Sequence, residues 1–141
     1  PSFDEEIDIV KSTTVGSRQK LDTIISRKEI LEYQELVLRV PVSDNVVEFA
    51  VKLSVNTRPQ DSSIDFVKEW VEWGAGPRAS QYLVLAAKAT AALDGRPSPQ
   101  INDIIEVAKP VLRHRIIPNF NAEAEGIDSD NIVEKLIQEL K

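Results

Sequence analysis

Hydrophobic residues recur at helical spacing along almost the whole chain. Ser2 is placed to cap a first helix in which Phe3, Ile7 and Val10 share one face and acidic residues fill the first turn. The segment from Lys11 to Thr23 is polar and contains a glycine. The chain is therefore predicted to begin with a short amphipathic helix and then a connecting loop.

Capping signals mark the next helices. Ser26 and Glu29 match the S-x-x-E capping box and precede an apolar periodic run. Leu36, Leu38 and Val40 also alternate, so a short extended end to this second helix is an alternative.

A third helix is expected to start at Ser43 or Asp44 and to finish by Arg58-Pro59. The segment 66–71 is predicted to be a short helix or turn.

The segment from Pro77 to Leu93 is apolar on almost every face, which is typical of a central, buried helix. Residues 94–97 (Asp-Gly-Arg-Pro) should end it. Ser98 is predicted to start another helix, and Pro110 to break or kink that helix.

The tail from Pro118 to Gly126 is expected to be irregular, and Asp128 or Ser129 to cap a last amphipathic helix. The fold class predicted for these 141 residues is all-α, a helical bundle with short links and a single core.

Charge and composition exclude several classes of function. The net charge of −6 disfavours bulk binding to nucleic acid or to an anionic membrane. The longest apolar run, 82–87, is far shorter than the ~20 residues of a membrane span. The absence of cysteine excludes disulfides and thiolate metal sites and suits a reducing, intracellular setting. A DNA-binding domain is disfavoured because it needs a basic recognition face.

Nucleotide-hydrolysis motifs are absent from the chain. It has no G-x-x-x-x-G-K-[ST] loop, and no apolar strand ends in paired acids for Mg²⁺. His114 is the only histidine, so no metal site is predicted. No G-x-S-x-G elbow supports a Ser–His–acid triad.

The start of the apolar helix carries the main candidate for binding. Gly76 fits the N-cap and Pro77 the first helical position, which places Arg78 in the first turn. A cation there is unfavourable by about 0.3–1 kcal/mol unless an anion joins it. A phosphate would meet both the free N–H groups and the guanidinium. The alternative is a solvated arginine just past a turn.

A second basic cluster, Arg113-His114-Arg115, has two interpretations. It is a candidate for contacts with phosphate or with an acidic patch on a neighbouring subunit. Alternatively, it complements the negative end of a helix dipole. Trp70 and Trp73 are expected to pack in the core, with stacking on a base as the alternative.

Several ordered blocks resemble one family and together cover essentially the whole chain. The blocks are residues 73–79 (WGAGPRA), 86–89 (AAKA), 95–97 (GRP) and 111–116 (VLRHRI), with the opening 1–6 and the tail 119–126. They resemble the C-terminal helical lid of MoxR-type AAA+ ATPases, relatives of the magnesium-chelatase group.

The resemblance implies that the chain is one part of a larger protein. Residues 1–25 would connect the lid, residues 26–141, to an ATPase core outside this sequence. That core supplies the phosphate-binding loop, the Mg²⁺ acids, sensor 1 and the arginine finger. Arg78 matches sensor 2, an arginine that reaches the γ-phosphate of its own or a neighbouring subunit, and Gly74, Gly76 and Pro77 set its turn. Many members carry serine where Gly76 or the residue before it stands here.

The function implied by the resemblance is mechanochemical. ATP with Mg²⁺ binds between core and lid in a cytoplasmic ring, expected to be a hexamer. The partners are the core of the same chain and neighbouring subunits, and often von Willebrand factor A-type proteins, in chaperone-like maturation or metal insertion. The fragment alone is expected to bind no cofactor and to be inert as an enzyme, while its parent is an ATPase.

A stand-alone acidic helical adaptor that binds proteins through an apolar groove is the alternative function. The chain starts at Pro1 and has no methionine, so a piece of something longer is expected; a reading frame that begins near Pro1 would favour the adaptor.

Overall fold

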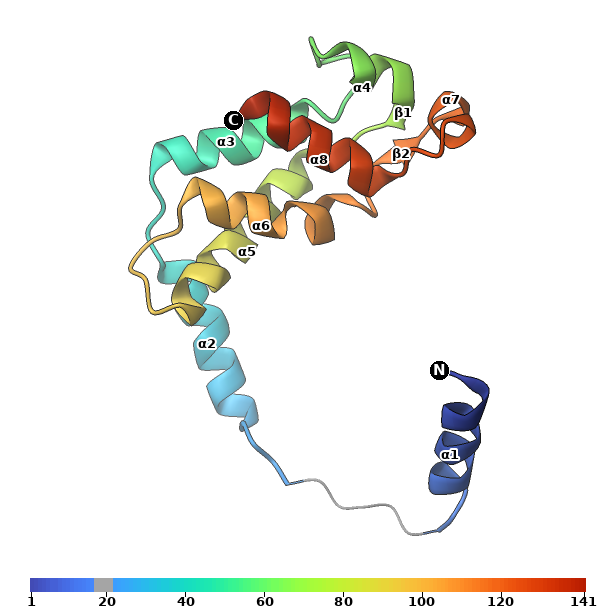
Figure 1. The fold of residues 1–141 in the computed structure, drawn as a ribbon. Coiled ribbons are helices and arrows are strands. Elements are labelled where there is room, and N and C mark those ends of the chain that lie inside the picture. The colour runs from blue at the N-terminus through green and yellow to red at the C-terminus, as the bar shows by residue number, and fades with distance from the viewer. Residues whose placement is uncertain (17–21) are drawn as a thin grey trace. The chain divides into compact units, whose positions relative to one another are not determined.

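The computed structural model describes residues 1–16 and 22–141 (Figure 1). The chain divides into two units, Pro1–Glu32 and Tyr33–Lys141, which are taken separately here. Part of the predicted 11–23 loop, residues 17–21, lies outside the described residues. The division falls inside one helix, and the assignment of residues 1–25 as a connector stays a prediction.

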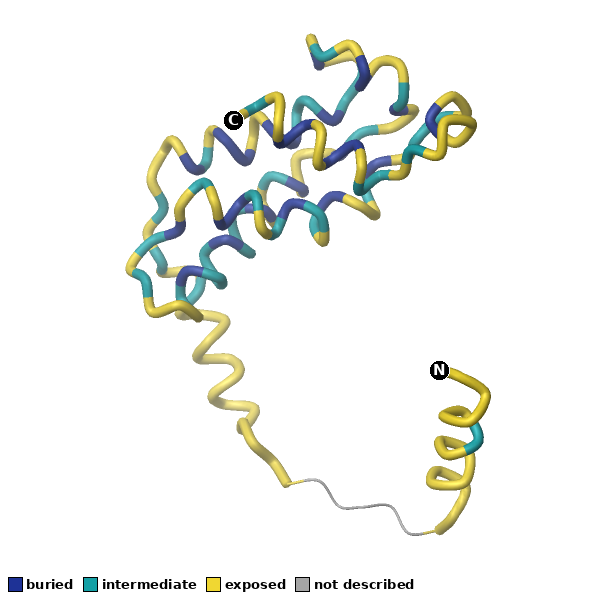
Figure 2. Tube along the Cα trace, viewed as in Figure 1, coloured by how far each residue is buried: buried dark blue, intermediate teal, exposed yellow. Residues whose placement is uncertain are grey.

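The first unit contains the predicted N-terminal helix, α1 (Phe3–Thr13). Its capping box is complete, because the Ser2 N–H donates to Glu5 Oε2 at 2.7 Å and the Glu5 N–H donates to Ser2 Oγ at 3.4 Å. The helix runs on to Thr13, so the prediction that the loop starts at Lys11 is wrong. No residue of α1 is buried (Figure 2).

Helix α2 (Arg27–Arg39) begins at the predicted capping box. The Ser26 N–H donates to Glu29 Oε2 at 2.8 Å, and the Glu29 N–H donates to Ser26 Oγ at 3.2 Å. The helix continues through Leu36 and Leu38, so the extended alternative is wrong. The alternation at these positions was a by-product of an amphipathic helix that here buries no residue.

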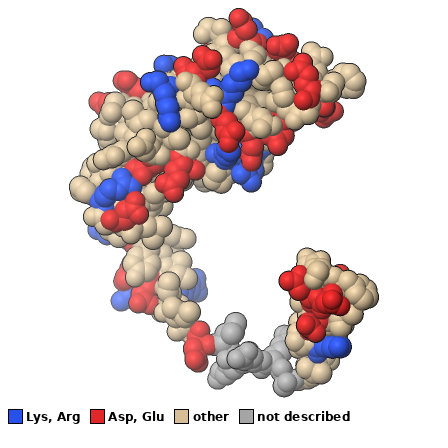
Figure 3. Space-filling view, viewed as in Figure 1, with Lys and Arg blue, Asp and Glu red and all other residues tan. Residues whose placement is uncertain are grey.

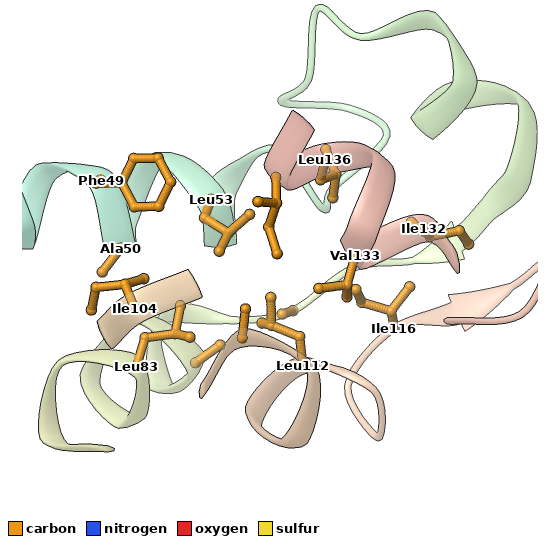
Figure 4. Packing of buried hydrophobic residues seen from close by; sticks show 14 of the residues in the cluster. Phe49, Ala50, Leu53, Leu83, Ile104, Leu112, Ile116, Ile132, Val133 and Leu136 are labelled. Carbon is orange, nitrogen blue, oxygen red and sulfur yellow. The ribbon is translucent and has the colours of Figure 1, made fainter. Parts of the chain in front are cut away.

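The second unit holds the hydrophobic core, and its all-α class is confirmed. The core packs α3 (Asp44–Val55), α5 (Pro77–Leu93), α6 (Ile101–Leu112) and α8 (Ser129–Leu140). Helix α5 packs chiefly against α6 and α3, and α8 covers α6. Figure 4 shows Leu53, Leu83, Ile104, Leu112 and Leu136 converging between these helices.

Helix α5 is buried on one face and not all round, so that prediction is corrected. Its buried residues are Ala79, Leu83, Ala87 and Ala91, a single stripe of spacing four. Leu93 remains 88% exposed on the other side. Alanine is a strong helix former at exposed positions too, so a run of alanines does not by itself require burial.

Helix α6 starts later than predicted and passes through its proline. Its N-cap is Gln100, whose N–H donates to Asp103 Oδ2 at 2.6 Å, and not the predicted Ser98. Pro110 lies in the last turn and is exposed, and the helix continues to Leu112. Solvent can reach the carbonyl that the proline ring leaves without its helical partner, so the break does not occur.

A small two-stranded ladder joins two segments that are distant in sequence. After α4 (Asp65–Trp70), β1 (Val71–Trp73) pairs antiparallel with β2 (Ile117–Pro118), which precedes α7 (Phe120–Ala124). Asn119 fixes the pairing, because its N–H donates to Trp70 O at 2.8 Å. The short helix near residue 66 is confirmed, whereas the irregular 118–126 tail is wrong, since α7 lies within it.

No helix within residues 1–16 and 22–141 is long and apolar enough to cross a membrane.

Candidate functional site

The start of α5 has the predicted geometry. Gly76 is the N-cap in an extended conformation, Pro77 is the first helical residue, and the Ala79 N–H donates to Gly76 O at 2.9 Å. Gly76 has no side chain with which to cap the turn. Arg78 is exposed and takes part in no ion pair within the described part of the chain. Its guanidinium is therefore available to an external anion.

Arg78 borders an open hollow of about 330 Å³ together with part of the second basic cluster. The fold brings these groups together through the β1–β2 ladder, which sets the segment after α6 beside the loop before α5. The residues around the hollow are Trp73, Gly74, Gly76, Arg78, Ala79, His114, Arg115 and Ile117. The lining thus carries cationic side chains and no carboxylate.

The cluster 113–115 is divided by the structure. Arg113 caps the C-terminus of α6 and pairs with Asp130 of α8 at 3.0 Å, so it does not border the hollow. Arg115 donates to Val111 O and lies over the Tyr82 ring at 5.3 Å. Its guanidinium also contacts the ring of His114. Arg115 therefore satisfies a carbonyl in the last turn of α6 and also borders the hollow, whereas the Arg113 side chain is engaged by Asp130.

The two tryptophans differ in environment. Trp70 packs on Phe66 with ring centroids 5.5 Å apart, and the Lys135 ammonium lies 4.2 Å from the Trp70 ring centroid. Trp73 is 69% exposed at the rim of the hollow. The expectation of core packing therefore suits Trp70 and is wrong for Trp73.

Sequence reasoning missed the residues that hold the loop before α5. The Ala75 N–H donates to Thr57 Oγ1 at 2.8 Å, and Arg58 Nε donates to Ala75 O at 2.7 Å. Gly74 lies so close to this segment that an added Cβ would be 2.3 Å from Thr57 O. The sequence signal at Arg58-Pro59 was interpreted only as a helix end.

Another arginine, Arg96, is occupied by internal partners. It donates to both carboxylate oxygens of Asp103, at 2.8 and 2.6 Å, and to Asp94 at 2.8 Å. The Arg96 hydrogen bonds hold the pKa of the nearly buried Asp103 below its usual value, against the effect of burial. This pair secures the α5–α6 turn and leaves Arg96 unavailable to a ligand.

The surface charge is mixed. Acidic and basic side chains are interspersed over the second unit on the face that Figure 3 shows. Within the described residues, no group of histidines and carboxylates could hold a metal ion. The candidate site is thus a local cationic hollow.

Comparison with known proteins defines the class. The family model described as AAA lid domain matches residues 66–136, which include the hollow, α5, α6 and most of α8. The chain belongs to the AAA lid domain family.

Its relatives specify the branch. The chain is 33% identical to Chaperone MoxR1 of Mycobacterium tuberculosis over 98% of its own length and 37% of the relative. It is 30% identical to YeaC of Bacillus subtilis, an uncharacterised protein, over 100% of its length and 42% of the relative. The resemblance to the lid of MoxR-type AAA+ ATPases is therefore confirmed, and the chain spans about two fifths of these relatives.

A solved structure agrees with the computed one. The chain matches a candidate ATPase from Cytophaga hutchinsonii with a TM-score of 0.79 and 29% identity, over 97% of this chain and 42% of that one.

Proposed function

We propose that this chain is the lid part of a MoxR-type AAA+ ATPase in which Arg78 is the sensor 2 arginine that contacts the γ-phosphate of ATP. The observation that carries the proposal is that Arg78 lies exposed at the start of α5, on the rim of a cationic hollow, with no ion pair to any residue in 1–16 or 22–141. A helix N-terminus and a guanidinium both favour a phosphate group.

The residues of the hollow suit the phosphate end of a nucleotide. Arg78 would bind the γ-phosphate, and Arg115 would add positive potential beside it, with the His114 ring also at the rim. The hollow has no carboxylate lining, so the Mg²⁺ ligands and the phosphate-binding loop would lie on the ATPase core. ATP bound there supplies the γ-phosphate charge, and its loss would remove the anion that holds Arg78 and α5 near the core.

The larger assembly is part of the same proposal. The lid would pack on its own core and on neighbouring subunits of a ring, with a hexamer as the expected size, in the cytoplasm. Arg78 would serve its own or the adjacent subunit. The work of the ring would be chaperone-like remodelling or metal insertion, with von Willebrand factor A-type proteins as partners. The M. tuberculosis relative is named a chaperone, which supports the proposed chaperone-like role.

The proposal is tested by steady-state ATP hydrolysis in the full-length protein that carries this lid. Arg78→Ala should lower turnover about 10- to 100-fold, since a hydrogen bond to a charged group contributes about 1.5–3 kcal/mol. Arg27→Ala is the matched control, because Arg27 is also an exposed arginine in a helix first turn and should leave turnover unchanged. Unchanged turnover in Arg78→Ala, with the fold intact, would reject the sensor role.

A protein-binding adaptor is the second candidate function. It is favoured by one observation, an apolar groove between α3 and α5 lined by Val47, Val51, Val84 and Leu85. The same experiment separates the two functions, because an adaptor that does not take part in hydrolysis would leave turnover insensitive to Arg78.

A further inference from the structure

We propose that Thr57 and Arg58 are positioning residues for Arg78, acting through the backbone of Ala75. This inference rests on the proposed function of Arg78 and adds to it the part of the fold that aims the side chain.

The loop 74–76 is held at one peptide position from two directions. Thr57 Oγ1 accepts from the Ala75 N–H at 2.8 Å, and Arg58 Nε donates to the Ala75 carbonyl at 2.7 Å. Ala75 is almost completely buried, so both of its backbone groups depend on these partners. The position of the loop is therefore determined by the segment that follows α3.

The two anchoring residues are themselves fixed. Thr57 is fully buried, and its hydroxyl donates to Ser54 O at 2.7 Å. The Arg58 side chain is 21% exposed and pairs with Asp61 at 3.2 Å. An anchor whose own rotamers are locked can hold a neighbouring group in one orientation.

Little flexibility separates Ala75 from Arg78. Gly76 is the N-cap, and its carbonyl accepts the Ala79 N–H and lies 3.5 Å from Ser54 Oγ. Pro77 has a fixed φ near the helical value. A displacement of the Ala75 peptide would therefore move the first turn of α5 and with it the base of the Arg78 side chain.

Arg58 is separate in role from the arginine it supports. It lies outside the lining of the hollow, and its guanidinium is engaged by Ala75 and Asp61. Unlike Arg78, Arg58 thus donates its hydrogen bonds to partners inside the protein. Its effect on hydrolysis would pass through Arg78 and not through contact with the nucleotide.

The test is a double-mutant cycle on ATP turnover in the full-length protein. Arg58→Ala should lower kcat about tenfold, because a small misplacement of a catalytic group is costly. In the Arg78→Ala background the same change should lower kcat no further, since the residue being positioned is already gone. Thr57→Val should act like Arg58→Ala, and Thr57→Ser, which keeps the hydroxyl, should restore turnover.

A core variant controls for loss of stability. Val133→Ala removes buried volume from α8, which contributes no residue to the lining of the hollow, and should keep wild-type turnover per folded molecule. The folded fraction of every variant is measured by circular dichroism under the assay conditions. If Val133→Ala lowers turnover as much as Arg58→Ala does at equal folded fraction, the role of Arg58 is only structural and the inference is overturned.

The remaining outcomes are distinguishable. Wild-type turnover in Arg58→Ala, combined with a loss in Arg78→Ala, overturns the positioning role and leaves the proposed function standing. Effects that multiply in the double variant also overturn it, because Arg58 would then act independently of Arg78. Wild-type turnover in Arg78→Ala itself rejects the proposed function.

Discussion

At the residue scale, the start of α5 depends on two glycines with different requirements. Gly74 faces the backbone at Thr57, where an added Cβ would lie 2.3 Å from the carbonyl oxygen. Gly76 has open space around its Cβ position, with nothing within 4 Å. The first glycine is therefore needed for close approach of two loops, and the second is replaceable.

Gly74→Ala should reduce the free energy of unfolding by about 1–3 kcal/mol, because backbone and not a flexible side chain has to move. The measurement is urea unfolding of the present chain followed by circular dichroism. Gly76→Ser is the matched control and should be unchanged or slightly more stable, since serine is a preferred N-cap. Equal urea midpoints for Gly74→Ala and wild type would show that the loops do not touch as described.

Local sequence rules predicted the part of the site that lies at the start of α5. Gly76, Pro77 and Arg78 follow one another, so their places in the helix cap could be read from residue preferences alone. Thr57 and Arg58 were missed because their contacts with Ala75 cross from one loop to another, and no local pattern reports such a pairing.

At the element scale, the helices were predictable and the ladder was not. The N-cap at Ser2 and the capping box at Ser26 predicted the starts of α1 and α2. Strands β1 and β2 are too short to show a period of two, and they pair across a long stretch of chain. That pairing brings His114 and Arg115 beside Arg78. The sequence alone therefore could not show that these residues line one hollow.

The turn from α5 to α6 should carry a measurable pH dependence through Asp103. Its pKa is lowered in the folded state by the Arg96 hydrogen bonds. The resulting stability is complete above the unfolded pKa, about 3.9, and is lost as the pH falls below it. Asp103→Asn should lower the free energy of unfolding at about pH 6 by about 1–2 kcal/mol, a value reduced for the partial exposure of Arg96.

Urea unfolding of wild type and Asp103→Asn, at about pH 6 and about pH 3, tests this pH dependence of stability. Wild type should lose more stability on acidification than the variant, since the variant lacks the titrating group. Exposed Glu5 and Glu29 also have lowered pKa values from their capping boxes, and they titrate in both proteins. The same loss in both proteins would contradict the assigned role of Asp103.

At the scale of the whole molecule, the acidic chain presents a small cationic hollow. The net charge is −6, yet the hollow is lined by Arg78, His114 and Arg115 without a carboxylate. The chain spans about two fifths of its relatives. The proposed sensor role of Arg78, on a sequence with no phosphate-binding loop, is what we expect of a lid whose nucleotide site is completed by another domain.

The most direct test of this account is the preference of the full-length protein for ATP over ADP, measured by isothermal titration calorimetry with a non-hydrolysable ATP analogue. Arg78→Ala should weaken binding of the analogue about tenfold or more and leave ADP affinity unchanged, because ADP has no γ-phosphate for Arg78 to contact. An unchanged ratio of the two affinities in the folded variant would contradict the assignment of Arg78 as the γ-phosphate sensor.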